Sequence, residues 1–343
     1  MTVSSGQPRT GDAADRTTGQ AADRTARMTG GQAAPGLAHR LEGAPFASEI
    51  RDRVSADVAA YAAEHGHPPG LAVVICGRSA PSMVYLERIL KACAQVGIEG
   101  SFVDVPGVGA ADQEFELAAA IKGLNDDRRI NGIIVQMPLP EGVRLRTVVD
   151  SIDPLKDIDG IHPLNAGLLR LGYEGFIPAT AHAALEMIHR SGATVQGADA
   201  VVIGRSPVVG MPLAFMLTKE DASVTVCHSK TRDLADKVSR ADIVVVAAGV
   251  PGLVTGAMLK PGAVVIDVGI NVVEGRIVGD VDFASAETVA SAITPVPGGV
   301  GPLTNALLLS HLMRAAQRQE QGGGGPSGAK ARGRAAEKGS TTA

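Results

Sequence analysis

The stretch 201–212, Val-Val-Ile-Gly-Arg-Ser-Pro-Val-Val-Gly-Met-Pro, indicates how the rest of the chain is organised. A short β-branched run ends at Gly204, and apolar residues with helical spacing begin after Gly210. A strand, a glycine loop and a helix N-terminus in this order can cradle a pyrophosphate, because free backbone N–H groups and the positive end of the helix dipole meet there. The spacing differs from the common G-x-G-x-x-G pattern, so an ordinary strand-to-helix turn is the alternative interpretation.

The loop after the next strand predicts which dinucleotide would bind. Residues 223–227 have the composition of a strand, and the loop 228–232, His-Ser-Lys-Thr-Arg, follows them. An acidic residue in such a loop would bond to the ribose 2′-hydroxyl of NAD, and this loop contains none. Its hydroxyls and cations suit the 2′-phosphate of NADP, and Arg205 can reach the same region from the end of the first strand. The loop therefore predicts NADP as the cofactor.

The composition is that of a globular α/β protein with sizeable cores. The chain has 343 residues, enough for about two domains, with 45% hydrophobic and 20% charged residues. A formal net charge of -4 gives no general attraction to nucleic acid or to an anionic membrane, and no apolar run is long enough to span a bilayer. The cysteines Cys76, Cys93 and Cys227 fall in no metal or redox spacing, so we expect reduced, buried thiols in a cytoplasmic protein.

Both ends of the chain have the composition of disordered tails. Residues 1–40 are rich in Gly, Ala, Thr, Asp and Arg and cannot bury enough apolar surface to order themselves. They also lack the apolar core of a secretory signal. Residues 321–343 contain four consecutive glycines and several basic residues, which could contact an acidic partner, although a solvated tail is the favoured interpretation.

Between the tails, strands and helices alternate, which predicts a doubly wound α/β architecture. The apolar run 130–137 is typical of a parallel strand covered on both faces, whereas 153–180 is expected to be mostly loop. We expect the last helix to leave the second half of the chain and to pack on the first. Strands are expected at 71–76, 101–105, 130–137, 201–203, 223–227, 243–247, 264–268 and 275–278, and helices at 47–65, 79–96, 113–125, 143–152, 181–191, 232–240 and 303–316.

Five segments, taken together and in this order, match the motifs of one family. They are Val-Gln-Met-Pro-Leu-Pro at 135–140, Lys-Asp-Ile-Asp-Gly-Ile-His-Pro at 156–163, Gly-Arg-Ser-Pro-Val-Val-Gly-Met-Pro at 204–212, Asp-Val-Gly-Ile-Asn at 267–271 and Thr-Pro-Val-Pro-Gly-Gly-Val-Gly-Pro-Leu-Thr at 294–304. Through them the sequence from Leu41 to Gln317 resembles the bifunctional methylenetetrahydrofolate dehydrogenase/methenyltetrahydrofolate cyclohydrolases, the FolD family.

The resemblance implies two α/β domains with the active-site cleft between them, usually in a homodimer. It implies a folate-binding catalytic domain of residues 41–178 plus 303–320 and a Rossmann-like NADP-binding domain of residues 179–302. The first family reaction passes a hydride from 5,10-methylenetetrahydrofolate to NADP. The second adds water to the methenyl product and opens its ring to 10-formyltetrahydrofolate, a one-carbon donor for purine biosynthesis.

The resemblance also assigns roles to individual residues. It implies that Tyr85 forms an aromatic wall for the folate, that Gln136 orients a catalytic lysine, and that Asp159 holds the pterin. A carboxylate can accept two hydrogen bonds from the N–H edge of a pterin, and a π face favours a cationic ring. Taken singly, the three could be a half-buried helix residue, a strand-end cap and a turn former. The implied folate contacts are Tyr85, Val135, Gln136, Met137, Asp159, Pro297 and Gly298, and the implied NADP contacts are Gly204, Arg205, Ser206, Gly210, Ser229, Arg232 and Ile270.

The chain departs from the family pattern at the catalytic lysine, where it has Ile89. Residues i and i+4 of a helix share a face, so we expect Ile89 to lie beside Tyr85 in the cleft. Arg88 could lean into the cleft, but its guanidinium stays protonated and is a poor proton shuttle. Lys91 points elsewhere. Two neighbouring signatures are altered as well, to Ala-Pro-Ser at 80–82 and Pro-Ala-Thr-Ala at 178–181.

Loss of the lysine should impair the cyclohydrolase more than the dehydrogenase, because hydride transfer needs mainly positioning whereas water addition needs a proton shuttle. Four hypotheses remain open: a full bifunctional enzyme in which Arg88 or a water replaces the lysine, a mainly monofunctional dehydrogenase, a non-catalytic folate- and NADP-binding sensor or partner subunit, and an oxidoreductase for another substrate. Retention of Gln136 and Asp159 argues against the last.

Overall fold

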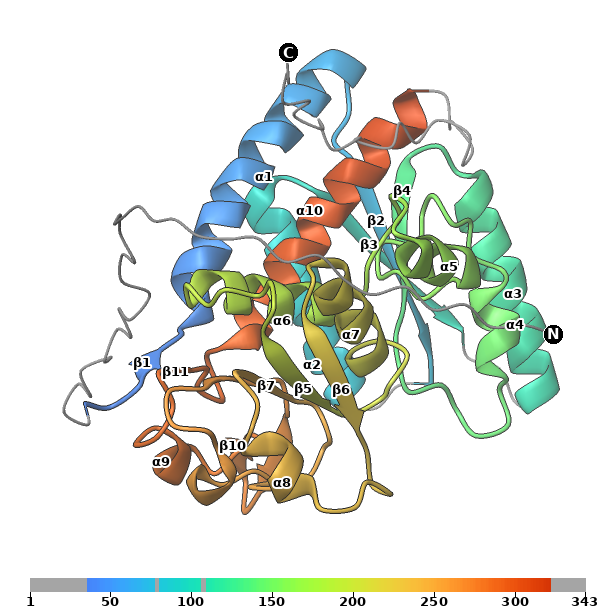
Figure 1. The fold of residues 1–343 in the computed structure, drawn as a ribbon. Helices are drawn as coiled ribbons and strands as arrows, with labels where there is room; N and C mark the ends of the chain where they lie inside the picture. The colour runs from blue at the N-terminus through green and yellow to red at the C-terminus, as the bar shows by residue number, and fades with distance from the viewer. Residues whose placement is uncertain (1–35, 78–79, 106–108, 322–343) are drawn as a thin grey trace, which may run out of the picture. The chain divides into compact units, whose positions relative to one another are not determined.

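The computed structural model describes residues 36–77, 80–105 and 109–321, and its strands form two parallel sheets and a hairpin (Figure 1). Within this part of the chain, no helix combines the length and the apolar composition that crossing a membrane requires. The predicted architecture of two parallel α/β layers is confirmed.

The first sheet contains three strands, of which two are buried on both faces and the third is mostly exposed. These strands are β2 (Gly70–Cys76), β3 (Glu99–Val105) and β4 (Ile130–Val135), in the order β3-β2-β4. The helices around the sheet are α1 (Gly43–His65), α2 (Ala80–Val96), α3 (Ala110–Asp126), α4 (Leu145–Val149) and α10 (Val300–Glu320). Because side chains alternate along a strand, Leu71 and Val73 join a core with α1, α2 and α10, while Ala72 and Val74 join a second core with α3 and α4. Burial on both faces explains the unbroken apolar runs.

The second sheet is the predicted nucleotide-binding unit. Its strands are β1 (His39–Arg40), β5 (Asp199–Ile203), β6 (Ser223–Cys227), β7 (Ile243–Val246), β8 (Val264–Asp267) and β11 (Ala292–Ile293). They are parallel and lie in the order β1-β11-β8-β7-β5-β6, so β5 pairs with β6 on one side and with β7 on the other. The order of the strands reverses at β5. Open α/β sheets bind ligands at the carboxyl ends of their strands at such a switch point.

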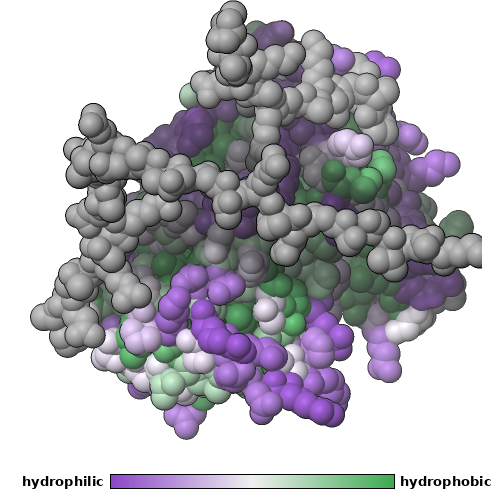
Figure 2. Space-filling view, viewed as in Figure 1, coloured by the Kyte–Doolittle hydropathy of each residue, from purple (hydrophilic) through white to green (hydrophobic). Residues whose placement is uncertain are grey.

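The remaining elements lie around these sheets. They are α5 (Pro163–Leu171), α6 (Ala179–Arg190), α7 (Gly210–Lys219), α8 (Leu234–Val238), the 3-10 turn η1 (Gly256–Met258), the antiparallel strands β9 (Asn271–Val273) and β10 (Arg276–Val278), and α9 (Phe283–Ala286). Hydrophilic side chains cover α8 and the loop that follows β6 on the face seen in Figure 2.

Helix α10 connects the two sheets. It follows the last strand of the second sheet and packs along α1, and it also contacts β4 of the first sheet and α6 (Figure 1). A side chain at Gly43 would collide with the backbone carbonyl of Gly299, so α1 and α10 begin in close backbone contact. The phenol of Tyr61 donates to Glu320 near their other ends, at 3.3 Å. The expectation that the last helix packs back on the first half of the chain is confirmed.

The structure corrects three expectations about the elements. The predicted tail 1–40 contains β1, a strand of two exposed residues with no apolar pattern, which pairs with β11 and forms an ion pair between Arg40 and Glu287. The predicted loop contains α5, which was missed because two of its leucines are exposed and a glycine interrupts it. Helix α10 begins at Val300, three residues early, within a glycine-rich stretch.

Candidate active site

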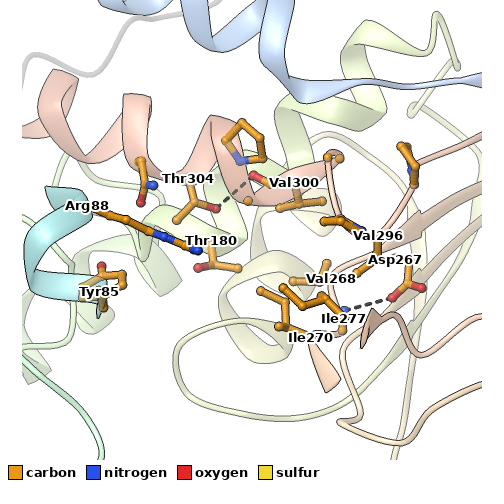
Figure 3. A pocket seen from close by; sticks show the side chains of 18 residues that line it. Tyr85, Arg88, Thr180, Asp267, Val268, Ile270, Ile277, Val296, Val300 and Thr304 are labelled. Carbon is orange, nitrogen blue, oxygen red and sulfur yellow. Dashed lines mark hydrogen bonds between the residues drawn. The ribbon is translucent and has the colours of Figure 1, made fainter. Parts of the chain in front are cut away.

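A cavity of about 450 Å³ lies where α2 faces the loops that follow β8 and β11 (Figure 3). Tyr85 and Arg88 of α2 line one side of it, and Thr180 at the start of α6 also lines it. The other side is formed by residues 267–270 and 295–299 and by the first turn of α10. The residues that were expected to bind folate or NADP and that line this cavity are Tyr85, Ile270, Pro297 and Gly298.

The carboxylate of Asp159 is close enough to Tyr85 to influence the ionisation of the Tyr85 phenol. Burial and, second, the charge of Asp159 raise the pKa of the Tyr85 phenol. Asp159 accepts a hydrogen bond from the backbone N–H of Ala179, the first residue of α6. Burial and, second, the charge of Asp157 raise the pKa of Asp159 to about 7. Tyr85 and Asp159, both expected to bind folate, therefore lie within electrostatic reach of each other, although Asp159 is not among the residues that line the cavity.

The residues before Asp159 serve as a scaffold for its loop. The ammonium of Lys156 is buried and donates to three backbone carbonyls near the end of α3, those of Leu124 (3.0 Å), Asn125 (2.7 Å) and Asp127 (2.8 Å). The buried carboxylate of Asp157 accepts from the N–H groups of Ile161 (3.1 Å) and His162 (2.8 Å) and from the amide of Asn165 (2.8 Å). Most of the motif 156–163 is thus structural, and Asp159 is its residue near Tyr85.

Two further contacts hold this loop against its neighbours. Gly160 has φ +64°, and a side chain there would lie 2.8 Å from the backbone carbonyl of Phe176, so only glycine lets the loop approach the segment that precedes α6. The ring of His311 in α10 is buried, and burial lowers its pKa to about 3. Neutral His311 donates from Nδ1 to the carbonyl of Ile158 at 3.0 Å, which leaves Nε2 to accept from His182 at 3.0 Å.

Gln136 lies at the carboxyl end of β4 and outside the residues that line the cavity. Its backbone N–H continues the β-ladder to the carbonyl of Val74 at 2.9 Å, and its side-chain amide donates to the carbonyl of Met137 at 3.0 Å. Val135 is buried in the strand, and Met137 is exposed. None of these three predicted folate contacts therefore lines the cavity beside Tyr85, and Asp159 does not line it either.

Ile89 does not line the cleft, which corrects the expectation that it would lie there beside Tyr85. Its side chain is 2% exposed and belongs to the main core. Leu86, Ile89 and Cys93 are all buried, and their spacing of three and four residues places Ile89 in the centre of the inward stripe of α2. Tyr85 lies at the edge of that stripe, and Arg88 is the α2 residue that extends into the cavity beside it (Figure 3).

The glycine loop after β5 is shaped by two close backbone approaches. Gly204 has φ +123°, and a side chain there would collide with the carbonyl of Ala247 at the end of β7. A side chain at Gly210 would collide with the carbonyl of Gly204. The hydroxyl of Ser206 accepts the N–H of Val209 at 3.1 Å just before α7. Because the loop lies at the switch point between β5 and β7, it fits a dinucleotide pyrophosphate.

The cations expected to select NADP are accessible. Ser229, Lys230 and Arg232 are exposed in a loop closed by the N–H of His228 donating to the hydroxyl of Thr231 at 2.8 Å. Arg205 is exposed and lines a separate cavity of about 220 Å³ between the glycine loop and α5. Within residues 36–77, 80–105 and 109–321, Arg205, Lys230 and Arg232 form no ion pair.

Two buried carboxylates organise the loops at the cavity: Asp267 begins the motif 267–271, whereas Asp280 belongs to none of the sequence motifs. Asp267 accepts from the N–H groups of Gly269 (2.9 Å), Asp280 (3.0 Å) and Val281 (2.9 Å), and burial raises its pKa to about 6. Asp280 accepts from the N–H groups of Ala248 (2.6 Å) and Gly249 (2.8 Å) and from the amide of Asn271 (2.8 Å). The pair ties the ends of β7 and β8 together. Among the described residues, no group of His, Cys, Asp and Glu could hold a metal ion.

Comparison with known proteins gives matches over both halves of the chain. Residues 41–159 match the family profile described as tetrahydrofolate dehydrogenase/cyclohydrolase, catalytic domain. Residues 178–320 match the profile described as tetrahydrofolate dehydrogenase/cyclohydrolase, NAD(P)-binding domain. The second profile includes the glycine loop, the loop after β6 and α10.

Similar proteins match nearly their whole length. The bifunctional protein FolD of Roseiflexus sp. is 48% identical over 81% of this chain and 96% of the relative. The crystal structure of the bifunctional enzyme FolD of Campylobacter jejuni is 39% identical, with a TM-score of 0.78 over 81% of this chain and 98% of that one. The Trypanosoma brucei methylenetetrahydrofolate dehydrogenase-cyclohydrolase, complexed with NADP and an inhibitor, is 38% identical, with a TM-score of 0.79 over 83% and 99%.

Proposed function

The chain belongs to the tetrahydrofolate dehydrogenase/cyclohydrolase family, and we propose that it oxidises 5,10-methylenetetrahydrofolate to 5,10-methenyltetrahydrofolate with NADP as the hydride acceptor. The observation that carries this proposal is the electrostatic proximity of Asp159 to Tyr85, which lines a cavity that extends to the loops of the nucleotide-binding sheet. One side of the cavity suits a pterin, and the other suits a nicotinamide.

In this proposal the folate is held by its pterin end. Ionised Asp159 accepts the N–H edge of the pterin, and the ring of Tyr85 forms a wall along it. A cation develops on the methylene-bearing ring when the hydride leaves, and the π face of Tyr85 stabilises that cation. Because burial keeps the phenol of Tyr85 neutral, Tyr85 acts through its ring and its hydrogen-bonding capacity rather than as an ionised base.

The nucleotide is held by the second sheet. The N–H groups at the start of α7 and the glycine loop receive the pyrophosphate, and the cations of loop 228–232 together with Arg205 receive the 2′-phosphate. Bound NADP supplies the hydride acceptor. The protein fixes the two rings against each other through the loops that Asp267 and Asp280 tie together, and this positioning is the main requirement of hydride transfer.

We further propose that hydrolysis of the methenyl product to 10-formyltetrahydrofolate, the second family activity, is weak in this protein. Addition of water requires a group that takes and returns a proton. Ile89 has no such group and is buried. Arg88 extends into the cavity, but its guanidinium stays protonated. The 10-formyl product, where formed, would serve purine biosynthesis. A purely non-catalytic role is not favoured, because relatives that match more than four-fifths of the chain are named as bifunctional enzymes.

The proposal includes a homodimer in the cytoplasm. Val272 is 74% exposed on the hairpin β9–β10, and a partner subunit would cover such an apolar side chain. Light scattering would measure the dimer, and a Val272→Asp variant that remained as dimeric as the unmodified protein would remove the hairpin from the interface. Cys76, Cys93 and Cys227 are free, buried thiols, in keeping with a reducing compartment.

The dehydrogenase proposal is tested by supplying 5,10-methylenetetrahydrofolate with NADP or with NAD and following reduced nucleotide by its absorbance. We expect turnover with NADP and a much higher KM for NAD. A protein that reduced neither nucleotide, although it bound the folate in calorimetry, would support the non-catalytic alternative. Equal KM values for the two nucleotides would contradict the assignment of loop 228–232 to a 2′-phosphate.

A further inference from the structure

Two histidines on neighbouring helices meet beside the loop that carries Asp159. His182 belongs to the first turn of α6, and His311 lies in the middle of α10. Their rings are 9° from parallel, and Nδ1 of His182 lies 3.0 Å from Nε2 of His311. His311 is buried, and neither ring lines the cavity beside Tyr85. Any effect of the pair on the reaction must therefore pass through the groups that it holds.

The acceptors on either side fix where each proton of the pair lies. Nδ1 of His311 is 3.0 Å from the carbonyl oxygen of Ile158, and a carbonyl can only accept, so Nδ1 carries the proton. Burial lowers the pKa of this ring to about 3, so Nε2 keeps its lone pair at neutral pH. His182 must then donate from its Nδ1, which it can do whether neutral or protonated. His182 thus selects the tautomer in which His311 holds the Ile158 carbonyl.

The pair closes a ring of contacts around Asp159. The carbonyl of Ile158 belongs to the peptide group that leads into Asp159, so His311 holds the backbone on one side of this residue. On the other side, the backbone N–H of Ala179 donates to the Asp159 carboxylate. Ala179 and His182 share the first turn of α6, and the bond from His182 to His311 completes the ring. The main chain and the carboxylate of Asp159 are therefore fixed to the same two helices.

The first turn of α6 connects this ring of contacts with the cavity. Thr180 follows Ala179 and lines the cavity (Figure 3). Thr180 and His182 are two residues apart, roughly 200° around a helix, so their side chains point to opposite sides of α6. One side of this turn therefore faces the cavity, and the other is held to α10 by the histidines. A shift of the turn would move the N–H group that binds the Asp159 carboxylate.

The two helices do not need the histidines to adhere. Apolar side chains of both helices, such as Met187 of α6 and Leu308 of α10, already belong to the main core. Apolar burial is non-directional, whereas a hydrogen bond requires its donor and acceptor to lie at one distance and angle. Two buried imidazoles also cost desolvation that apolar side chains in their place would not. What the pair adds to the packing is therefore the exact placement of the Ile158 carbonyl.

We propose that His311 is a positioning residue for the dehydrogenase reaction and that His182 orients it, so that together they hold Asp159 where it meets the pterin. The inference rests on the proposed function, in which the Asp159 carboxylate accepts from the pterin. Because a misplacement of about 1 Å can cost about 100-fold in rate, loss of the His311 contact should lower kcat/KM for 5,10-methylenetetrahydrofolate at least about tenfold. The KM for NADP should stay unchanged, since loops 204–210 and 228–232 lie outside the ring of contacts.

Three variants of His311 separate positioning from a general loss of packing. His311→Leu removes both hydrogen bonds. The amide nitrogen of asparagine ends near the place of Nδ1 and can donate to Ile158, whereas the amide of glutamine ends near the place of Nε2. The value of kcat/KM for the folate should therefore be low in His311→Leu and His311→Gln and should largely recover in His311→Asn. Equal values in the asparagine and glutamine variants would overturn the proposal.

The matched control is His189→Leu, which removes an exposed histidine from the same helix as His182. It should leave kcat/KM for the folate unchanged. A loss in this control as large as that in His311→Leu would show that any change in α6 or α10 disturbs the reaction, and it would overturn the specific role of the pair.

A double-mutant cycle tests the part played by His182. His182→Leu removes the donor to Nε2, so His311 can move its proton there, and Nδ1 then no longer donates to Ile158. We expect kcat/KM for the folate to fall. In the His311→Asn background the same change should have little effect, because an amide has no tautomer to select. Equal effects of His182→Leu in the two backgrounds would contradict the orienting role.

Two measurements separate this inference from the proposed function. Heteronuclear NMR of the imidazole nitrogens should show His311 neutral, with its proton on Nδ1. Calorimetry should show weaker binding of tetrahydrofolate to His311→Leu than to the unmodified protein, whether or not the protein turns over 5,10-methylenetetrahydrofolate. Absence of turnover with tetrahydrofolate still bound would refute the proposed function alone. Unchanged affinity in a folded His311→Leu variant, or a proton on Nε2 in the unmodified protein, would overturn the positioning role.

Discussion

Replacement of Ile89 by lysine restores the family's residue at a position where the structure has a buried apolar side chain. The stem of the new lysine must leave the inward stripe of α2, and its ammonium must reach the cavity beside Tyr85, which is one helical turn away. If the amine arrives there, it supplies the missing proton shuttle. We expect Ile89→Lys to raise the rate of methenyltetrahydrofolate hydrolysis by about 100- to 10,000-fold.

The same change should lower the stability of the protein, and the magnitude follows from the burial of Ile89. The side chain is 2% exposed, so nearly all of its apolar surface is lost from the core. Full burial of an isoleucine is worth about 1.5–3 kcal/mol, and the methylene groups of lysine recover part of this. A net loss of about 1–2 kcal/mol corresponds to a fall in Tm of roughly 2–8 °C.

Three measurements decide the outcome for this variant. Hydrolysis is followed by the loss of methenyl absorbance with methenyltetrahydrofolate supplied directly, Tm is followed by calorimetry, and dehydrogenase activity shows that the site is intact. Ile89→Met is the matched control, since it changes the shape of the core side chain without adding an amine, and it should leave hydrolysis unchanged. The reasoning is refuted if the unmodified protein already hydrolyses the methenyl compound rapidly, or if a folded, dehydrogenase-active Ile89→Lys variant gains no hydrolysis.

Three other changes test separate parts of the site. Arg205→Ala should raise the KM for NADP and leave that for NAD little changed in steady-state assays, and an equal rise for both would contradict a contact with the 2′-phosphate. Asp159 has a pKa of about 7, so the fraction of its ionised, hydrogen-bond-accepting form increases as pH rises through 7. The value of kcat/KM for the folate should therefore rise over that range. Asp159→Asn should lower kcat/KM and abolish its rise with pH. The raised pKa also means that the stability Asp159 contributes at low pH is lost as pH rises through 7. The free energy of unfolding should therefore differ less between pH 6 and pH 8 in Asp159→Asn than in the unmodified protein, as measured by denaturation. Asp280→Ala leaves three hydrogen-bond donors without their acceptor and should cost about 3–5 kcal/mol in a denaturation titration, whereas a loss under 1 kcal/mol would show that water replaces the carboxylate.

The parallel sheets were predictable because their inner strands, such as β2, β4 and β7, are buried on both faces. The apolar runs 71–76 and 243–246 admit few other structures, and the glycine loop after β5 marks the switch point. The short strand β1 and the exposed helix α5 were not predictable, since neither buries a periodic apolar face.

The candidate site was predictable only in part, and the reason is geometric. Motif residues indicated Tyr85 and Asp159, and both are close in the structure. The i, i+4 rule placed Ile89 beside Tyr85, but the rule does not state which of the two faces the core. That depends on how α2 packs, and the buried series of Leu86, Ile89 and Cys93 gives the answer. Likewise, a cavity of about 220 Å³ between α1, α2 and α10 brings Arg51 and Lys91 together from two helices, and no sequence motif links them.

We propose that this protein oxidises 5,10-methylenetetrahydrofolate with NADP and hydrolyses the product poorly, and one assay follows both reactions. The most direct test follows NADPH and the methenyl chromophore together after the purified protein receives 5,10-methylenetetrahydrofolate and NADP. We predict that the two products rise in equal amounts and that methenyltetrahydrofolate then decays near its spontaneous rate. NADPH formation with little methenyltetrahydrofolate at any time, and with 10-formyltetrahydrofolate appearing at the same rate as NADPH, would contradict the account.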